Sequence, residues 1–192
     1  MAPAHHARPG SAGVTRTVCL HGPESTGKTT LGPRLAEALG GIYVEEFGRT
    51  WSEAKGLGFT MTDLVAIAKG HMAAMRDALN RRPAWIVTDT DPLMTAVWAD
   101  MLFGTRDPWF DRFRDTSDFY LMFDIDLPWV PDGTRMFGTE ELRLRFFELA
   151  KAELDKRRVP WTLVGGRGDD RFRNALAAID DAADRGCFPV AA

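Results

Sequence analysis

The stretch from Gly22 to Thr29 constrains this chain more than any other. Its letters, GPESTGKT, match the pattern G-x-x-x-x-G-K-[ST] at every fixed position. A short apolar run, residues 17–20, precedes it, and an amphipathic segment, residues 31–39, follows it. Strand, glycine-rich turn and helix in this order form the loop that cradles phosphate groups. The sequence therefore predicts a phosphate-binding P-loop.

Each fixed residue of this loop has a physical reason to be there. Gly22 and Gly27 let the backbone turn tightly, so that successive amide groups and the N-terminus of the helix point at one anion. Lys28 would reach the β- and γ-phosphate oxygens, and the Thr29 hydroxyl would bind Mg²⁺. The alternative is a chance match in a glycine-rich loop. The predicted nucleotide-binding set is Gly22, Glu24, Ser25, Thr26, Gly27, Lys28, Thr29 and Thr30.

Five short apolar runs alternate with stretches of helical periodicity. The runs cover residues 17–20, 42–44, 84–88, 119–123 and 161–164. Strands that alternate with helices at these spacings form a parallel sheet covered by helices on both faces. We therefore predict an α/β fold of the P-loop NTPase class with a five-stranded parallel sheet. Residues 14–192 are expected to form a single domain after a disordered tail, residues 1–13.

The composition argues against several classes of function. The 192 residues include 24 lysines and arginines and 27 acidic residues, so the formal net charge is -3. Proteins that bind nucleic acids or membrane surfaces usually carry a basic excess, so neither partner is expected. No apolar run approaches the roughly 18 residues of a membrane span, and the only cysteines, Cys19 and Cys187, make no disulfide framework. We expect a cytoplasmic protein with a small-molecule partner, and its oligomeric state is left open.

Acidic residues follow two of the predicted strands. Glu46 comes shortly after the second strand, and Asp89 and Asp91 follow the third. P-loop enzymes hold Mg²⁺ with a carboxylate on a neighbouring strand, and strand ends face the ligand crevice in open α/β sheets. Asp89 is therefore predicted to bind Mg²⁺ together with Thr29. A solvated acidic turn is the alternative for Glu46, and a helix N-cap followed by proline is the alternative for Asp91.

Residues 127–138 have the composition of a mobile loop. They contain two prolines, two glycines and Arg135, without apolar periodicity. A phosphoryl-transfer site must exclude water, because ATP is otherwise hydrolysed, so such enzymes close a segment over the phosphates. We interpret this stretch as a lid whose Arg135 reaches the transferred phosphoryl group. The alternative for Arg135 is an ordinary surface arginine.

The segment from Thr139 to about Arg157 is predicted to be a helix. Its charges pair at a spacing of four residues, for example Glu153 with Arg157. Pairs of this kind are typical of a solvated helix face. We therefore expect most of these charges to be exposed.

Several motifs together resemble the ribosylnicotinamide kinase domain of the bacterial bifunctional NAD-biosynthesis and regulatory proteins. The resemblance covers roughly residues 15–185 and rests on GPESTGKTTL at 22–31, EFGR at 46–49, DTD at 89–91 followed by Val97-Trp98, and DIDLPW at 124–129 with DGTR at 132–135. It implies an ATP-dependent kinase that phosphorylates the 5′-hydroxyl of nicotinamide riboside to give nicotinamide mononucleotide. ATP and Mg²⁺ are the implied cofactors.

The resemblance also implies roles for individual residues. Lys28 and Thr29 would hold ATP and magnesium. Asp89 and Glu46 would lie near the metal and the acceptor hydroxyl, and either could take the hydroxyl proton. Arg135 would belong to the lid, which completes the catalytic set of Lys28, Asp89, Glu46 and Arg135.

The predicted substrate-binding residues are Glu46, Arg49, Asp91, Trp98 and Trp129. The cationic pyridinium of nicotinamide riboside favours aromatic faces and carboxylates, although each tryptophan could equally be packing in the core or at its rim. Gly48 stands where the family usually has alanine, and Pro131 and Thr134 also depart from its pattern, and these departures bear on the identity of the acceptor. The alternatives are a kinase for another nucleoside or vitamin alcohol, and a regulatory ATP-binding module without catalysis.

Overall fold

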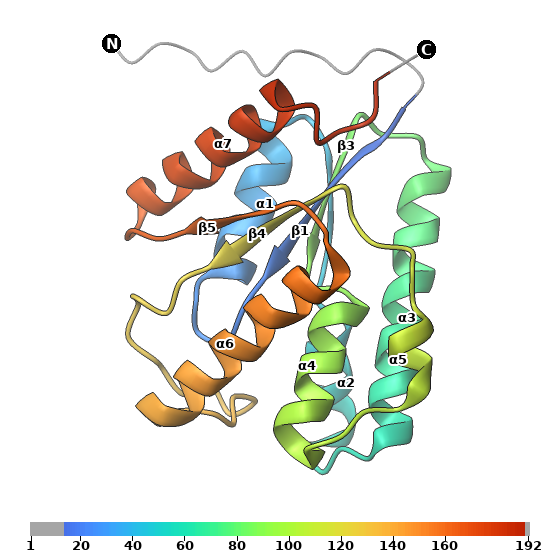
Figure 1. Ribbon diagram of the computed structural model, residues 1–192, viewed down its shortest axis with the longest axis vertical. Coiled ribbons are helices and arrows are strands. Elements are labelled where there is room, and N and C mark those ends of the chain that lie inside the picture. Colours follow the sequence, from blue (N-terminus) through green and yellow to red (C-terminus); the bar gives the residue numbers. More distant parts are fainter. Residues whose placement is uncertain (1–13, 191–192) are drawn as a thin grey trace.

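The P-loop strand lies at the centre of a parallel sheet. The computed structural model describes residues 14–190 and contains five strands, β1 (Arg16–His21), β2 (Ile42–Val44), β3 (Trp85–Asp89), β4 (Phe119–Phe123) and β5 (Trp161–Val164). Their order in the sheet is β2-β3-β1-β4-β5, and every pair is parallel (Figure 1). The predicted fold class is confirmed.

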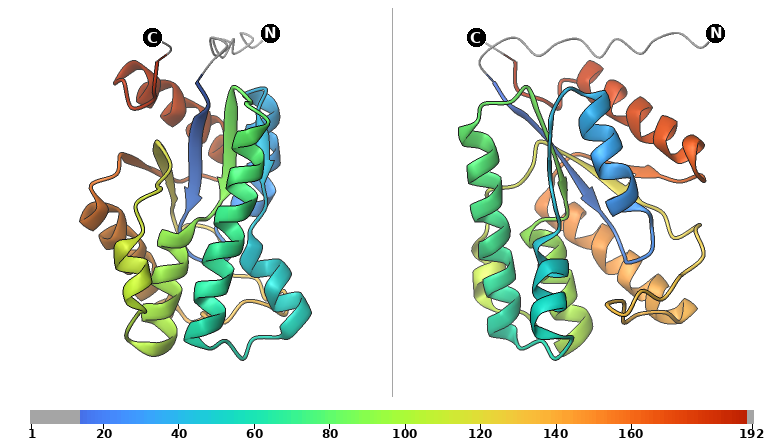
Figure 2. Two further views of the ribbon diagram at one scale, coloured as in Figure 1. Left: turned by 90° about the vertical axis from the view of Figure 1, so that its right-hand side faces the viewer. Right: turned by 180° about the vertical axis from the view of Figure 1, so that it is seen from behind.

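Helices cover both faces of this sheet. They are α1 (Lys28–Ala38), α2 (Phe47–Lys55), α3 (Met61–Asn80), α4 (Pro92–Phe103), α5 (Pro108–Arg112), α6 (Glu140–Arg157) and α7 (Asp169–Asp184). Figure 2 shows α1 and α7 on the side of the sheet opposite to α6. The α4 helix packs against α6 and α3, and α3 also packs against α2. The P-loop and the strand ends therefore lie between two helical layers.

Side-chain alternation along β1 explains the two layers. Val18 and Leu20 are fully buried and join the apolar cluster that includes Leu35 of α1 and Ile179 of α7. Cys19, which points to the other face, packs in the cluster formed with α4 and α6. Successive strand residues face opposite sides of a sheet, so a strand buried on both faces reads as a continuous apolar run.

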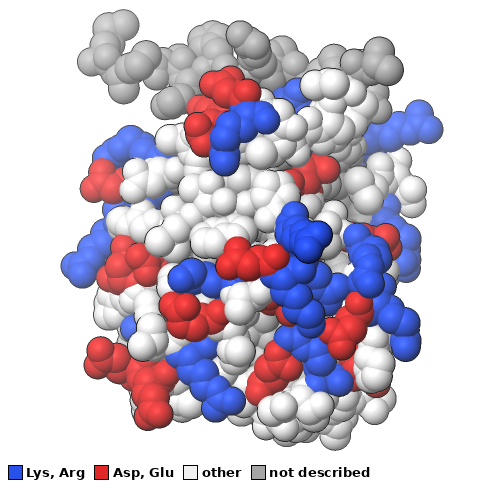
Figure 3. All heavy atoms as spheres, viewed as in Figure 1, with Lys and Arg blue, Asp and Glu red and all other residues white. Residues whose placement is uncertain are grey.

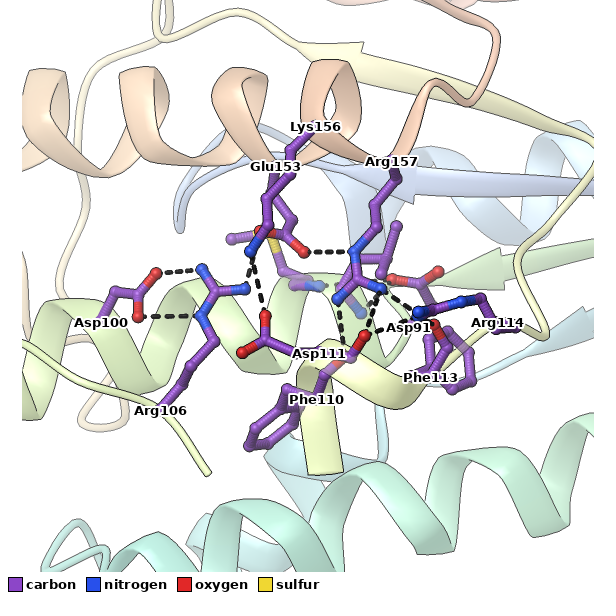
Figure 4. Close-up of polar contacts among 12 residues, drawn as sticks. Asp91, Asp100, Arg106, Phe110, Asp111, Phe113, Arg114, Glu153, Lys156 and Arg157 are labelled. Atoms are coloured by element: carbon purple, nitrogen blue, oxygen red, sulfur yellow. Dashed lines mark hydrogen bonds and ion pairs between the residues drawn. The ribbon is translucent and has the colours of Figure 1, made fainter. Parts of the chain in front are cut away.

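Two local features differ from the expectations. The helix α2 was not predicted, because none of its residues is fully buried and only Phe47 and Trp51 give it an apolar side. The pair of Glu153 with Arg157 forms as predicted, at 2.7 Å, but its expected exposure is wrong, because the Glu153 side chain is only 2% exposed. Figure 4 shows that Glu153 lies between Arg157 and Arg106 in a buried ionic network.

This network fastens the short helix α5 to α6. Arg157 donates hydrogen bonds to the carbonyl groups of Phe110 (2.6 Å) and Phe113 (2.9 Å). Arg106 contacts Asp100 of α4 as well as Glu153. Elsewhere on the face seen in Figure 3, acidic and basic side chains are interspersed.

The remaining expectations concern the chain ends and the lid. The predicted disordered tail, residues 1–13, lies outside the described residues, and the single domain stays a prediction. Residues 127–138 contain neither helix nor strand. Within residues 14–190, no helix combines the length and the apolarity needed to cross a membrane.

Gly32 and Gly48 form a matched pair for testing how tightly the helices pack. A Cβ at Gly32 would lie 2.2 Å from the Tyr43 ring, whereas a Cβ at Gly48 would meet nothing closer than 3.7 Å. Both residues lie in helices. Gly32→Ala should lower the free energy of unfolding by about 1 to 3 kcal/mol through overpacking. Gly48→Ala should leave it unchanged or slightly higher, because alanine favours helix. Urea unfolding measures both, and equal effects would contradict the packing.

Candidate functional site

The P-loop connects β1 to α1 and depends on two glycines in left-handed conformations. Gly22 has φ 128° and Gly27, which caps α1, has φ 88°. A Cβ at Gly22 would also lie 2.9 Å from the carbonyl oxygen of Phe123 on β4. Residues other than glycine are disfavoured at both places by backbone strain, and at Gly22 also by this close approach. The local geometry therefore requires the glycines that the motif fixes.

The lysine of the motif is held inside this loop. The Lys28 ammonium donates hydrogen bonds to the carbonyl oxygens of Gly22 (2.8 Å) and Pro23 (2.6 Å), and the side chain is buried. Burial lowers the pKa of Lys28, while the charges of Asp89 and Glu46 act in the opposite direction. The two carboxylates favour the charged form of the ammonium, which the carbonyl oxygens of the loop hold in place.

Asp89 joins the P-loop to the neighbouring strand. It is the last residue of β3 and is fully buried. Its Oδ2 atom accepts hydrogen bonds from the Thr29 hydroxyl (2.8 Å) and the Tyr43 hydroxyl (3.0 Å), while its buried Oδ1 has no partner among the described residues. A hydroxyl and a carboxylate are the hard oxygen ligands that Mg²⁺ prefers. The residues present therefore fit the predicted Mg²⁺, with Thr29 and Asp89 as the residues that would hold it.

Tyr43 is a site residue that the sequence did not reveal. It lies in the middle of β2, and its ring packs on Gly32, where α1 carries no side chain. Burial first, and then the charge and hydrogen bond of Asp89, raise the pKa of Tyr43 well above its usual value. Tyr43 thus stays a neutral donor that orients Asp89. The sequence signal for this contact is Gly32, because a glycine inside a helix leaves room for an aromatic ring.

Glu46 stands at the N-cap of α2 and faces the same centre. Burial and the charge of Asp89 raise the pKa of Glu46 to about 7, against the opposing charges of Lys28 and Arg49. The Arg49 Nε atom lies 4.0 Å from the Glu46 carboxylate. A carboxylate that titrates near neutral pH is well matched to accepting a proton from a substrate.

Asp91 is placed differently from Asp89 and Glu46. Its Oδ1 accepts the amide hydrogens of Leu93 (2.9 Å) and Met94 (3.3 Å), and its Oδ2 accepts the Tyr120 hydroxyl (2.5 Å). The carboxylate is therefore engaged in capping α4, and Asp91 is not among the residues that line the pocket at the P-loop. This placement favours the capping alternative over substrate binding.

One pocket brings most of the predicted residues together. Its first wall is the P-loop, and it includes every residue of the predicted nucleotide-binding set. Its second wall comes from α2, α3, α4 and the lid. The charged, apolar and aromatic side chains of this wall include Glu46, Arg49, Phe59, Leu64, Ile67, Met94, Trp98 and Arg135. Asp89 lies behind Thr29 rather than on the pocket surface. Trp129 lies elsewhere, in a separate hollow with Ile125 and Arg143.

The predicted lid packs directly on the P-loop. The Glu24 carboxylate accepts the amide hydrogens of Met136 (2.9 Å) and Phe137 (3.0 Å). Arg135 donates to the Ser25 hydroxyl (3.2 Å) and also contacts the carbonyl of Val130. The positions that the P-loop motif leaves variable are therefore the ones that hold the lid.

Arg171 is the second residue that the sequence reasoning missed. It is 1% exposed, and it donates to the carbonyl oxygens of Thr26 (3.0 Å) and Gly166 (2.8 Å) and pairs with Asp126. It thus ties α7 and the ends of β4 and β5 to the P-loop. Helical periodicity could have found it, because Arg171 shares the buried face of α7 with Ala175 and Ala178.

The raised pKa of Glu46 predicts how stability depends on pH. Between the ordinary pKa of 4.5 and the folded-state pKa of about 7, the folded protein keeps a proton that the unfolded chain releases. The free energy of unfolding of the wild type should therefore fall through this window as pH rises. Glutamine does not titrate, so the free energy of unfolding of Glu46→Gln should not fall in this window. The free energy of unfolding of the variant, relative to that of the wild type, should therefore rise by about 1 to 3 kcal/mol from pH 5 to pH 8. Urea unfolding at both pH values tests this, and a constant difference would contradict it.

Comparison with known proteins agrees with this geometry. A family model described as an AAA domain, AAA_28, matches residues 17–171. The trifunctional NAD biosynthesis/regulator protein NadR of Escherichia coli (strain K12) is 28% identical over 171 residues, which are 85% of this chain and 42% of that protein. The sequence resemblance to these NAD-biosynthesis and regulatory proteins is therefore confirmed.

Solved structures support the same relationship. A NadR protein in complex with NR superposes with a TM-score of 0.68 at 26% identity, over 87% of this chain and 51% of that chain. Thymidylate kinase from Ehrlichia chaffeensis shares the fold, with a TM-score of 0.64 at 15% identity over 88% of this chain and 99% of that chain. This chain spans about half the length of the NadR proteins that it matches. It belongs to the AAA_28 family of P-loop domains.

Proposed function

We propose that this protein is an ATP-dependent kinase that transfers a phosphoryl group to the 5′-hydroxyl of nicotinamide riboside, giving nicotinamide mononucleotide. The observation that carries the proposal is the convergence of Lys28, Thr29, Glu46 and Arg135 on one pocket. The 28% identity to NadR over most of the chain supports the choice of reaction. Phosphoryl transfer needs positioning and charge neutralisation more than a nucleophile on the protein.

The P-loop side of the pocket would bind ATP. Its backbone amides and the N-terminus of α1 would receive the phosphate oxygens, and the Lys28 ammonium would neutralise their charge. Thr29 and Asp89 would hold Mg²⁺, which supplies charge neutralisation for the transferred phosphoryl group. Tyr43 keeps the Asp89 carboxylate oriented through its 3.0 Å hydrogen bond. The lid would exclude water and bring Arg135 to the phosphates.

Glu46 is the better candidate for taking the proton of the acceptor hydroxyl. Asp89 already accepts two hydrogen bonds on Oδ2 and lies behind Thr29, whereas Glu46 lines the pocket and has a pKa of about 7. A base is most effective when its pKa lies near the working pH. This assigns metal binding to Asp89 and proton transfer to Glu46.

The second wall of the pocket would receive the nucleoside. Phe59, Leu64, Ile67, Met94 and Trp98 supply apolar and aromatic surface beside Glu46. A cationic pyridinium is attracted both to an aromatic face and to a carboxylate. Trp98 and Glu46 line the same pocket, so a base stacked on Trp98 and a ribose near Glu46 would share it. A solved relative, 26% identical, holds NR.

Phosphoryl transfer can be measured as ADP release with nicotinamide riboside, compared with a panel of other nucleosides and vitamin alcohols. Nicotinamide riboside should be the best acceptor, because its positive charge matches Glu46 and Trp98. Asp89→Asn should lower the rate by about 10² or more, as when one preorganised electrostatic group is removed. The surface variant Asp170→Asn should match the wild type.

Three outcomes would count against the proposal. If the protein prefers another acceptor, the assignment as a kinase stands and the assignment of nicotinamide riboside as its substrate is wrong. Wild-type turnover in Asp89→Asn would reject the metal assignment. A protein that binds ATP and phosphorylates no acceptor would instead act as a regulatory ATP-binding module.

A further inference from the structure

The carboxylate of Asp132, in the lid, performs two separate tasks with its two oxygens. Oδ1 accepts hydrogen bonds from the Thr134 amide (3.0 Å) and hydroxyl (2.8 Å), which closes a turn inside the lid. Oδ2 lies 3.2 Å from Nη1 of Arg49 and 3.1 Å from Nε of Arg135. A single oxygen therefore joins the lid to α2.

The two arginines serve different parts of the pocket. Arg135 belongs to the lid and contacts Ser25 of the P-loop, on the nucleotide side. Arg49 belongs to α2 and stands beside Glu46, on the side assigned above to the nucleoside. The buried Nε of Arg49 has no hydrogen-bond acceptor among the described residues. Arg49 therefore faces Glu46 through Nε and Asp132 through Nη1.

The bridge is partly shielded from solvent and permanently charged. The side chains of Asp132, Arg49 and Arg135 are 26%, 33% and 22% exposed. Desolvation acts to raise the pKa of Asp132, but the hydrogen bonds from Thr134 and Arg49 and the charge of Arg135 outweigh it and hold this pKa at about 2. The carboxylate is therefore ionised throughout the neutral range, and the bridge does not depend on pH there.

We propose that Asp132 is a positioning residue that couples closure of the lid to occupation of the nucleoside side of the pocket, by holding Arg49 and Arg135 on one carboxylate oxygen. The proposal rests on the kinase function proposed above. A kinase whose lid closes on ATP alone wastes ATP by hydrolysis. A lid arginine tied to the opposite wall reaches its working position only when both walls are in place.

Asp132→Asn separates the two tasks. The side-chain oxygen of asparagine can still accept the Thr134 hydrogen bonds, while its NH₂ group cannot accept from either arginine. Asp170→Asn is the matched control, because Asp170 also pairs with an arginine three residues away, Arg173, but on the exposed surface of α7. The comparison therefore isolates the bridge from a general loss of one carboxylate.

Hydrogen exchange tests the coupling without any acceptor. In Asp132→Asn, amide exchange should be about three- to tenfold faster in both the lid, residues 127–138, and α2, residues 47–55. Arg49→Gln should speed up exchange in both segments to the same extent. Arg49→Lys, which keeps the positive charge, should give a smaller increase. Asp170→Asn should change neither. Faster exchange in the lid of Asp132→Asn with α2 unchanged would overturn the proposal.

The kinetic consequence is a change in how ATP is used. With the acceptor present, Asp132→Asn should transfer phosphate about tenfold more slowly than the wild type. It should also hydrolyse a larger share of the ATP to free phosphate. Its affinity for ATP with Mg²⁺, measured by calorimetry, should be unchanged. An unchanged ratio of hydrolysis to transfer would overturn the proposal. If the wild type phosphorylates no riboside, the proposed function fails, and the exchange experiment still decides whether Asp132 couples the two segments.

Discussion

The hydrogen bond between Thr29 and Asp89 is the contact on which the site depends. It exists because β1 and β3 are parallel neighbours in a register that pairs Leu20 with Asp89. The end of β3 therefore lies level with the end of β1, where the P-loop begins. The amide of Thr90 donates a hydrogen bond to the carbonyl of Leu20 (3.0 Å), which fixes this alignment of the two strands. A slip of one residue would turn the Asp89 side chain to the other face of the sheet.

Buried charge is concentrated around this contact and is compensated in different ways. Arg171 is satisfied by several carbonyl groups and Asp126, as a buried cation must be. Lys28 is held by carbonyl groups, and Glu46 responds to burial with a raised pKa. One oxygen of Asp89 keeps no partner among the described residues. Groups that stay incompletely paired in a buried place mark where chemistry can occur.

The lid shows how one short loop can serve two partners. Glu24 and Ser25 occupy variable positions of the P-loop motif, which needs their backbone amides for phosphate binding but does not fix their side chains. In this fold they hold the backbone of the lid and Arg135. The loop that cradles phosphate thus also positions the segment that would cover it, and Asp132 extends this arrangement to α2.

The sequence by itself determined the five strands, the parallel sheet and the P-loop with its lysine and threonine, because these depend on local patterns of apolar residues, glycine and helix caps. It also marked Asp89, Glu46 and the lid as neighbours of the site. It left open whether Asp91 binds the substrate or caps a helix, because that depends on which groups of distant segments, such as Tyr120, face its carboxylate. Tertiary structure decided that Asp91 caps a helix, and it brought in Tyr43 and Arg171. It also buried Glu153 between Arg157 and the distant Arg106, since contacts between residues far apart in the chain leave no periodic trace in the sequence.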